Sequence, residues 1–374
     1  MKRGISHEYI RDLAEAQNTP AVSIYMPVQT PTIKNPEQQE NMKRLKNLKR
    51  EAENALEQHG YSDTRSLLKP LRDAREQESP AWDFKAQGFA CFLSPERAEF
   101  VSLPSTPPER VEIGDHFSIR PLIGAFTEAT GFYILSLDQR CVRLLYGDSF
   151  SVSDVSTQKP LPNMSQVLAE YDFEQSQNAA PGARTGVRFD PEADLKSYLF
   201  EFIDRLDEVV VEEIGKDSLP VVLAGVEYIV GHYRKRTRLR SLTDDYVRGS
   251  PSQLGEEELH RRSREIVSQE AEAMRREALQ RLDDVPQESW LTDLEQILPA
   301  AYEGRTASLF IDPEREVRGS FEPMSQLVTH DSSGESADEL LDLAATFTLR
   351  NGGSVYAFSE DQLPAGGPAL AIHR

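Results

Sequence analysis

The spacing of hydrophobic residues predicts strands and helices in three successive regions of the chain. In the first region, residues 21–28 (AVSIYMPV) are typical of a short apolar strand, and residues 88–104 of two strands around a tight turn. Between them, residues 36–60 carry apolar side chains at three- and four-residue spacings, the pattern of a helix with one buried face. That face consists of Met42, Leu45, Leu48, Ala52 and Leu56.

The middle region shows strands and a helix in alternation. Residues 131–148 (GFYILSLDQRCVRLLYGD) again predict two strands around a polar turn, and residues 191–215 have apolar residues at helical spacing. Residues 219–230 (LPVVLAGVEYIV) are too continuously apolar for a half-exposed strand, which favours a strand covered on both faces. The alternation indicates an α/β layer fold.

The last region follows a polar stretch, residues 240–253, that is typical of a linker. A long charged helix is expected over residues 255–282, a strand within residues 305–322, and a helix that Asn351-Gly352-Gly353 terminates. The predicted fold is α/β, with three domains that each contain a mixed sheet and helices. These are an N-terminal α+β domain (1–125), a middle domain (126–240) with a long mobile loop at 172–190, and an acidic C-terminal α/β domain (241–374).

The composition, 39% hydrophobic and 28% charged among 374 residues, is typical of a soluble globular protein. No stretch approaches the roughly 20 apolar residues of a membrane span, and we find no signal-peptide pattern at the start of the chain. Cys91 and Cys141 lie in apolar, strand-like runs, so we expect buried thiols in a reducing compartment. The predicted location is cytoplasmic, with no membrane partner.

The formal net charge of −20 is unevenly distributed along the chain. Residues 1–125 hold 17 basic and 18 acidic residues (net −1), residues 126–240 hold 13 and 18 (net −5), and residues 241–374 hold 12 and 26 (net −14). Nucleic-acid binding needs lysine and arginine to displace counterions. We therefore expect only the first two thirds to approach RNA, and we expect no DNA partner.

Two basic runs stand out against this acidic background. The first lies on the helix at residues 36–60, where a solvated helix face is the alternative interpretation. The second, HYRKRTRLR, has no acid among its cations and favours phosphate binding, with pairing to the acidic last third as the alternative. The candidate RNA-binding residues are Lys43, Arg44, Lys46, Lys49 and Arg50 in the first run, and Arg234, Lys235, Arg236, Arg238 and Arg240 in the second.

No motif indicates a metal or cofactor site. The seven histidines show no HExxH or other ligand spacing, and neither a G-x-S-x-G elbow nor a phosphate-binding G-x-x-x-x-G-K-[ST] loop occurs. Acidic residues are so frequent that a carboxylate pair would not be diagnostic of acid–base catalysis. We therefore predict neither a metal nor a cofactor.

The order of several segments resembles a known group of translation factors. GFYILSLDQRCVRLLYGDSFSV, DLKSYLFEFIDRLDEVV and LPVVLAGVEYIV together resemble the middle domain of the archaeal and eukaryotic peptide-chain release factors and of Pelota. TASLFIDPEREVRGSF, LLDLAATFTLRNGGSVYAF and ALAIHR resemble their third domain, a ribosomal-protein-like α/β layer. VSIYMP followed by RLKNLKREAENAL is similar to the bacterial archaeo-eukaryotic release factor group.

This resemblance implies a ribosome-associated factor. Its middle domain would point towards the peptidyl-transferase centre, and its third domain would engage protein, in relatives a translation GTPase. The charge distribution agrees, since the first two domains would face ribosomal RNA and the domain of net −14 would face protein.

One departure from the resemblance concerns catalysis. True release factors carry Gly-Gly-Gln in the loop before the middle-domain helix, whereas the corresponding SQNAAPGARTG has no adjacent glycine pair. Pelota-type members also lack the motif, so the resemblance implies a non-hydrolytic factor for rescue, recycling or dormancy, with a loop tip that contacts RNA. The tip residues are Pro181, Gly182 and Gly186, its cations are Arg184 and Arg188, and Gln175 and Gln177 are the candidates for orienting a water.

Two other functions stay open at this point. The chain could be a release factor or peptidyl-tRNA hydrolase that acts through residues 172–190. It could also be a regulator without a ribosomal role, since a fold does not determine function. In that case the acidic last domain and the helix at 255–282 would carry the protein contacts.

Overall fold

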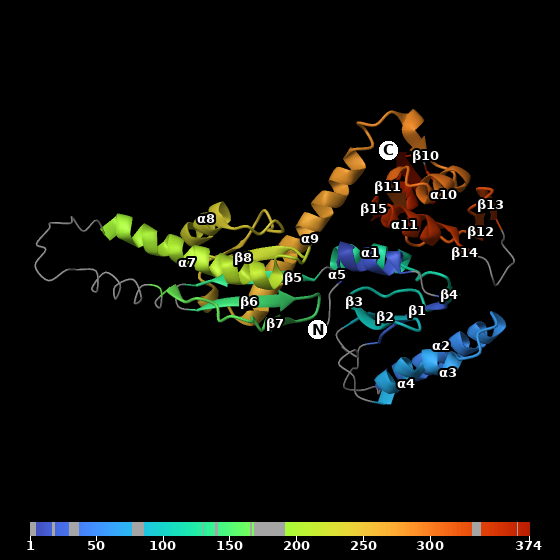
Figure 1. Ribbon diagram of the computed structural model, residues 1–374, viewed down its shortest axis with the longest axis horizontal. Helices are drawn as coiled ribbons and strands as arrows, with labels where there is room; N and C mark the ends of the chain where they lie inside the picture. The colour runs from blue at the N-terminus through green and yellow to red at the C-terminus, as the bar shows by residue number, and fades with distance from the viewer. Residues whose placement is uncertain are drawn as a thin grey trace, which may run out of the picture. The chain divides into compact units, whose positions relative to one another are not determined.

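The chain separates into two compact units. Unit 1 joins Met1–Ala129 to Glu272–Arg374, and unit 2 is Thr130–Ala271. Both contain sheets and helices (Figure 1), which confirms the predicted mixed α/β class, while the predicted domain boundaries stay a prediction. The computed structural model describes residues 5–16, 19–29, 37–76, 86–129, 131–138, 141–164, 167, 191–330, 338–364 and 366–374.

The first sheet of unit 1 is antiparallel, with the order β3-β2-β1-β4. Successive side chains of a strand point to opposite faces, so Val22, Ile24 and Met26 belong to one hydrophobic cluster, and Ala21 and Tyr25 to another. The strands are β1 (Ala21–Pro27), β2 (Gly88–Leu93), β3 (Ala98–Leu103) and β4 (Arg110–Gly114).

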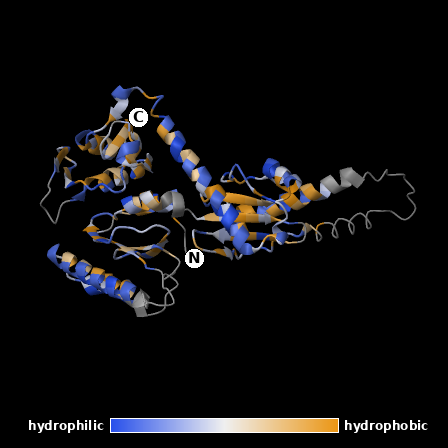
Figure 2. Ribbon diagram, turned by 180° about the vertical axis from the view of Figure 1, so that it is seen from behind, coloured by the Kyte–Doolittle hydropathy of each residue, from blue (hydrophilic) through white to orange (hydrophobic). Residues whose placement is uncertain are grey.

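Helix α2 (Glu37–Gln58) covers one face of this sheet. The predicted apolar face is confirmed for Leu45, Leu48, Ala52 and Leu56, which are all buried with the sheet residues, whereas Met42 is only partly buried. Figure 2 shows hydrophilic and hydrophobic residues alternating along this helix, as expected for a helix with one exposed side. The short helices α3 (Thr64–Leu67) and α4 (Lys69–Glu76) follow it.

The other face of the sheet packs against helices from both ends of the sequence. Leu13 of α1, Leu122 of α5 and Leu341 of α11 share one hydrophobic cluster with Tyr25. The early residues of the chain and its last hundred therefore have a common core, which explains why they form a single unit. The helices involved are α1 (His7–Glu15), α5 (Arg120–Ala129), α10 (Leu294–Tyr302) and α11 (Leu340–Arg350).

Two further sheets complete unit 1. The larger has the order β10-β16-β11-β15, with β11 parallel to β15, and the smaller has the order β13-β12-β14. Their strands are β10 (Trp290–Leu291), β11 (Thr306–Ile311), β12 (Arg318–Glu322), β13 (Leu327–His330), β14 (Asp338–Glu339), β15 (Ser354–Ala357) and β16 (Ala369–His373).

Unit 2 is a five-stranded sheet of order β7-β6-β5-β8-β9 with helices on both faces. Leu223 packs with α7 and α8, while Val222 and Ala224 pack with the first part of α9. This confirms the prediction of a strand covered on both sides. The elements are β5 (Phe132–Leu137), β6 (Val142–Gly147), β7 (Val152–Asp154), α7 (Pro191–Ile214), β8 (Val221–Gly225), α8 (Glu227–Arg236), β9 (Val247–Arg248) and α9 (Glu256–Gln280).

The strand predicted at residues 219–230 is shorter than expected. It ends at Gly225, and α8 begins at Glu227. Ile229 and Val230 are buried, but they reach the core from a helix. An apolar run cannot by itself distinguish a buried strand from a buried helix segment, and here it contains both.

Two other sequence expectations need correction. The stretch taken as a linker contributes β9, whose Val247 is 2% exposed and pairs with Ala224. Cys91 is buried as predicted, whereas Cys141 is exposed because it lies just before β6. Within the described ranges, no helix combines the length and the apolar character needed to cross a bilayer.

A buried polar network ties the two sequence segments of unit 1 together. The carboxylate of Asp342 accepts hydrogen bonds from the backbone N–H groups of Ile119 (2.8 Å) and Arg120 (2.6 Å). The guanidinium of Arg120 is 2% exposed and forms an ion pair with Glu339 (Nε–Oε2 3.2 Å). Glu339 in turn accepts the N–H groups of Val317 and Asp342, which caps the start of α11.

Candidate nucleic-acid interface

Three cations form an exposed stripe on α2. Lys43, Lys46 and Arg50 are exposed and lie within about 60° of one another around the helix axis, given about 100° per residue. The stripe faces solvent because the opposite side of α2 is buried against the sheet. No acidic side chain within the described ranges lies at ion-pair distance from any of the three. We call Lys43, Lys46 and Arg50 the α2 stripe.

The other two cations of this predicted run have structural partners. Arg44 donates to the Pro27 carbonyl oxygen (3.1 Å) and pairs with Glu109 (Nε–Oε2 2.9 Å). Lys49 pairs with Glu53 one turn further along the helix (Nζ–Oε1 2.9 Å). The α2 stripe is therefore the part of the run whose charge stays available to an anionic partner.

In the second run, two arginines pair with acids of α7. Arg236 donates to Asp204 (Nε–Oδ1 2.8 Å), and Arg238 donates to Asp207 (Nε–Oδ2 2.9 Å). Asp207 is buried and also accepts a hydrogen bond from the Thr237 hydroxyl. The neutralising acids thus come from the same unit, and not from the last third of the chain as the sequence alternative supposed.

The remaining cations of this run differ in their accessibility. Arg234 is partly buried and donates to the carbonyl oxygens of Thr243 (2.8 Å) and Asp245 (3.1 Å). Lys235 and Arg240 are exposed, and the described residues place no acid within ion-pair distance of either. The structure places the five cations at the end of α8 and in the segment after it. Among them, Lys235 and Arg240 are exposed and have no acidic partner among the described residues.

An aromatic ladder on α7 and α8 lies beside these cations. The ring of His232 contacts Tyr228 (centroids 4.7 Å apart) and Phe200 (5.3 Å), and the guanidinium of Arg236 lies 4.7 Å from the Phe200 centroid. Tyr228 is 51% exposed. The sequence interpretation missed this ladder because it placed residues 219–230 in a strand. The available signal was the helical i, i+4, i+8 spacing of Tyr228, His232 and Arg236.

The predicted loop tip lies outside the described residues. Residues 172–190 belong to the part of the chain for which no structure is given. The roles predicted there therefore stay predictions. The residues concerned are Gln175, Gln177, Pro181, Gly182, Arg184, Gly186 and Arg188.

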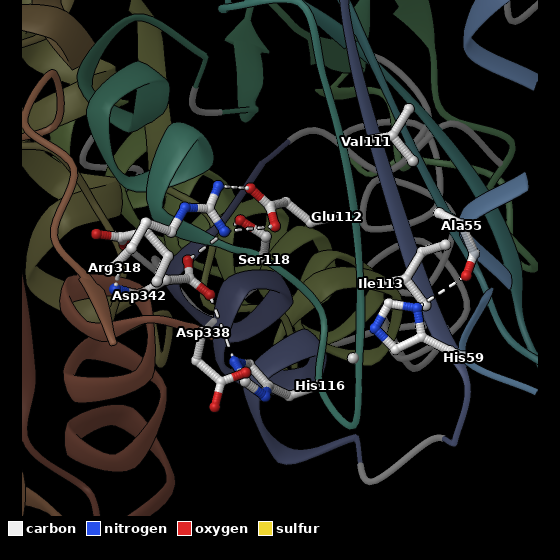
Figure 3. A pocket seen from close by; sticks show the side chains of 12 residues that line it. Ala55, His59, Val111, Glu112, Ile113, His116, Ser118, Arg318, Asp338 and Asp342 are labelled. Carbon is white, nitrogen blue, oxygen red and sulfur yellow. Dashed lines mark hydrogen bonds and ion pairs between the residues drawn. The ribbon is translucent and has the colours of Figure 1, made fainter. Parts of the chain in front are cut away.

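A pocket in unit 1 is lined by charged side chains from β4, β12 and the segment around β14. Figure 3 shows Arg318 facing Glu112, and His116 facing Asp342. Arg318 pairs with Glu112 (Nη2–Oε1 2.6 Å), and His116 lies 3.7 Å from Asp342 (Nε2–Oδ2). Because these charged groups pair with one another, the pocket is a junction between the two sequence segments of unit 1. It is a weaker candidate for ligand binding than the exposed cations of α2 and α8.

Burial changes the protonation of this junction. It raises the pKa of Glu339 to about 7 and that of Asp342 to about 6, because the desolvation of each carboxylate outweighs the favourable effects of Arg120 and the backbone N–H groups. Burial also lowers the pKa of His116. The junction therefore favours neutral carboxyl groups in mildly acidic solution.

Residues 131–305 match the family described as "Bacterial archaeo-eukaryotic release factor family 3". This segment includes nearly all of unit 2 and the start of the second segment of unit 1. The match confirms the predicted resemblance over this segment: residues 131–305 are similar to the bacterial archaeo-eukaryotic release factors.

Solved structures of translation factors are similar to the chain at low identity. An archaeal translation termination factor, aRF1, is 14% identical (99% of this chain and 98% of that chain covered, TM-score 0.21). Pelota of Archaeoglobus fulgidus is 12% identical (76% and 79%, TM-score 0.27). Dom34 of S. cerevisiae, a translation termination-like factor, is 11% identical (78% and 82%, TM-score 0.38). No curated protein matches the chain.

The junction predicts that the stability of unit 1 falls as the pH rises. Because the pKa of Glu339 in the folded protein exceeds its usual 4.5, the folded state retains a proton that the unfolded chain releases. This stabilisation is complete below about pH 4.5 and is lost as the pH rises through 7. The urea midpoint, followed by tryptophan fluorescence with Trp290 as the probe in unit 1, should be lower at pH 8 than at pH 5.

The variant E339Q removes one titrating group and should reduce that difference between pH 5 and pH 8. E288Q, at an exposed position of the same unit, is the matched control and should behave as the unsubstituted chain. An E339Q protein with the same pH dependence as the unsubstituted chain would contradict this assignment.

Proposed function

We propose that this release factor-like chain is a ribosome-associated translation factor that works without hydrolysing the peptidyl ester, in rescue, recycling or dormancy. The observation that carries the proposal is the family match over residues 131–305, which includes the helix α7 and the residues before it. The sequence of residues 172–190 lacks Gly-Gly-Gln, which supports a role other than ester hydrolysis.

The α2 stripe is the best candidate for contact with ribosomal RNA in the first part of the chain. Its three cations are exposed along one helix face, where they can contact phosphates, while the neighbouring Arg44 and Lys49 are engaged by acids. Such contacts release counterions, so they weaken as the salt concentration rises. Lys235 and Arg240 provide a second, smaller set of exposed charges in unit 2.

The acidic last third fits a protein partner better than RNA. Its net charge of −14 repels phosphate but attracts basic ribosomal proteins, or a basic surface on a translation GTPase. This division assigns the RNA contacts to residues 1–240 and the protein contacts to residues 241–374.

The triple variant K43E/K46E/R50E tests the RNA contact. We expect it to reduce co-sedimentation with purified bacterial ribosomes at low salt by at least about 10-fold, because each position changes from attracting phosphate to repelling it. The dependence of binding on salt should also become weaker, by up to about 2 to 3 in the slope of log K against log[salt] for three lost phosphate contacts.

The matched control is R276E/R281E/R315E, which makes the same change in formal charge at exposed positions of the acidic last third. This control should bind ribosomes nearly as well as the unsubstituted chain. Equal losses in both triple variants would mean that net charge alone matters, and unchanged binding in K43E/K46E/R50E would remove the α2 stripe from the interface.

A release assay separates the proposal from the hydrolase alternative. Ribosomes carrying a radiolabelled peptidyl-tRNA should retain their peptide when the purified chain is added in excess, because the loop sequence lacks Gly-Gly-Gln. If peptide is released, and if Q175A/Q177A abolishes that release, the chain is a hydrolase and the non-hydrolytic role is wrong.

A further inference from the structure

One side of helix α8 carries an exposed tyrosine ring, a glycine and two cationic side chains. Tyr228, His232 and Arg236 follow at spacings of four, and Gly231 and Lys235 lie three and seven residues after Tyr228, which places all five on one side of the helix. Phe200 of α7 supports His232 and Arg236 from beside them. We call these six residues the α8 platform.

Gly231 is the informative member of the platform. Glycine is among the least favourable residues inside a helix, and here packing does not require it, because a Cβ at this position would meet no atom within 4 Å. The position is thus open and could hold a better helix former. Glycine is the residue that lets another molecule approach a backbone closely, so Gly231 makes a flat space beside the Tyr228 ring.

The ladder holds the platform in place. Arg236 is fixed over Phe200 by its bonds to Asp204, and His232 lies between Phe200 and Tyr228. Tyr228 contacts His232 with an interplanar angle of 77° and remains 51% exposed. A supported ring at the edge of such a ladder is available for stacking with little loss of conformational freedom.

The exposed apolar area is suited to a nucleobase and too small for the core of a protein interface. In the described part of unit 2, Val226 and Tyr228 are the only large hydrophobic residues with exposed side chains, whereas a stable protein interface buries about 800 Å² on each side. Two cations follow on the same side of α8, since Lys235 and Arg236 lie seven and eight residues after Tyr228, about two helical turns along the helix. Bases stack on aromatic rings while cations contact the phosphates.

We propose that the α8 platform binds an unpaired nucleotide of RNA. The base stacks on the Tyr228 ring, the sugar–phosphate backbone passes over Gly231, and the Nζ of Lys235 contacts a phosphate oxygen. This inference rests on the proposed ribosomal function and adds a specific contact to it. The platform selects single-stranded over duplex RNA, because a paired base within a helix cannot present its face to the ring.

The test uses the full chain and two fluorescein-labelled probes, a 12-nucleotide oligo(U) and a 12-base-pair RNA duplex, with binding followed by fluorescence anisotropy. Y228A should weaken oligo(U) binding by between about 5-fold and about 150-fold, the range of one lost stacking contact, and change duplex binding less than 2-fold. Y302A, which removes a 44% exposed tyrosine in unit 1, is the matched control and should leave both affinities unchanged.

The variant G231L fills the open space without removing any contact. It should raise the melting temperature, since leucine favours the helix, and should weaken oligo(U) binding as much as Y228A does. This pair of opposite effects distinguishes occlusion of a binding surface from damage to the fold. Oligo(U) affinity within 2-fold of the unsubstituted chain in both Y228A and G231L would overturn the proposal, as would equal losses on the duplex.

Ribosome co-sedimentation of Y228A, measured in parallel, distinguishes failure of the α8 platform from failure of the proposed ribosomal function. If the unsubstituted chain and Y228A pellet with ribosomes equally, the platform is wrong and the ribosomal function stands. If the unsubstituted chain does not pellet, the ribosomal function is wrong. If Y228A binds ribosomes more weakly than the unsubstituted chain but keeps its full affinity for oligo(U), Tyr228 contacts a ribosomal protein. That result would overturn the RNA proposal.

Discussion

The structure of unit 1 depends on the buried carboxylate of Asp342. Its hydrogen bonds from the N–H groups of Ile119 and Arg120 connect positions more than 200 residues apart in the sequence. Arg120 and Glu339 complete the contact as a buried ion pair. Removing one partner of such a pair leaves an uncompensated charge, which typically costs about 3–5 kcal/mol. The early and late parts of the chain therefore fold as one unit and share one apolar core.

The charged residues of the chain divide into those that maintain this architecture and those left for a partner. Arg120 is buried within unit 1, and Arg236 and Arg238 are held by Asp204 and Asp207 of α7. The α2 stripe, Lys235 and Arg240 have no such role within the described residues. In a protein of net charge −20, these exposed cations are the positions that we propose for contact with an anionic partner.

Local sequence patterns correctly predicted the helices and hairpins whose buried faces follow from the spacing of their own apolar residues. The apolar spacing around Leu45 and Leu48 identified the buried face of α2, because a helix in contact with a sheet needs one continuous stripe. The hairpins at residues 88–104 and 131–148 followed from their alternation and polar turns. The run at 219–230 failed as a single strand, since Gly225 ends β8 and the apolar residues after it are equally suited to a helix.

The candidate site was predicted only in part, for a physical reason. A basic run is visible in sequence, but whether each cation is neutralised depends on partners that tertiary structure supplies, such as Asp204 for Arg236 and Glu109 for Arg44. The ladder of Tyr228, His232 and Phe200 is built from two helices. Only the i, i+4 spacing of Tyr228 and His232 on α8 can be recognised in the sequence, because the contact with Phe200 of α7 depends on tertiary structure. The Asp342 network has no local pattern at all.

We propose that the chain meets the ribosome through RNA, which contacts the first two thirds of the chain. The most direct measurement is ultraviolet crosslinking of the full chain to purified bacterial ribosomes, followed by identification of the RNA-linked peptides by mass spectrometry. Our account predicts crosslinks within residues 43–50 and residues 228–240, and none in residues 272–374. Crosslinks confined to residues 272–374, or ribosome-bound protein that crosslinks to no RNA, would contradict it.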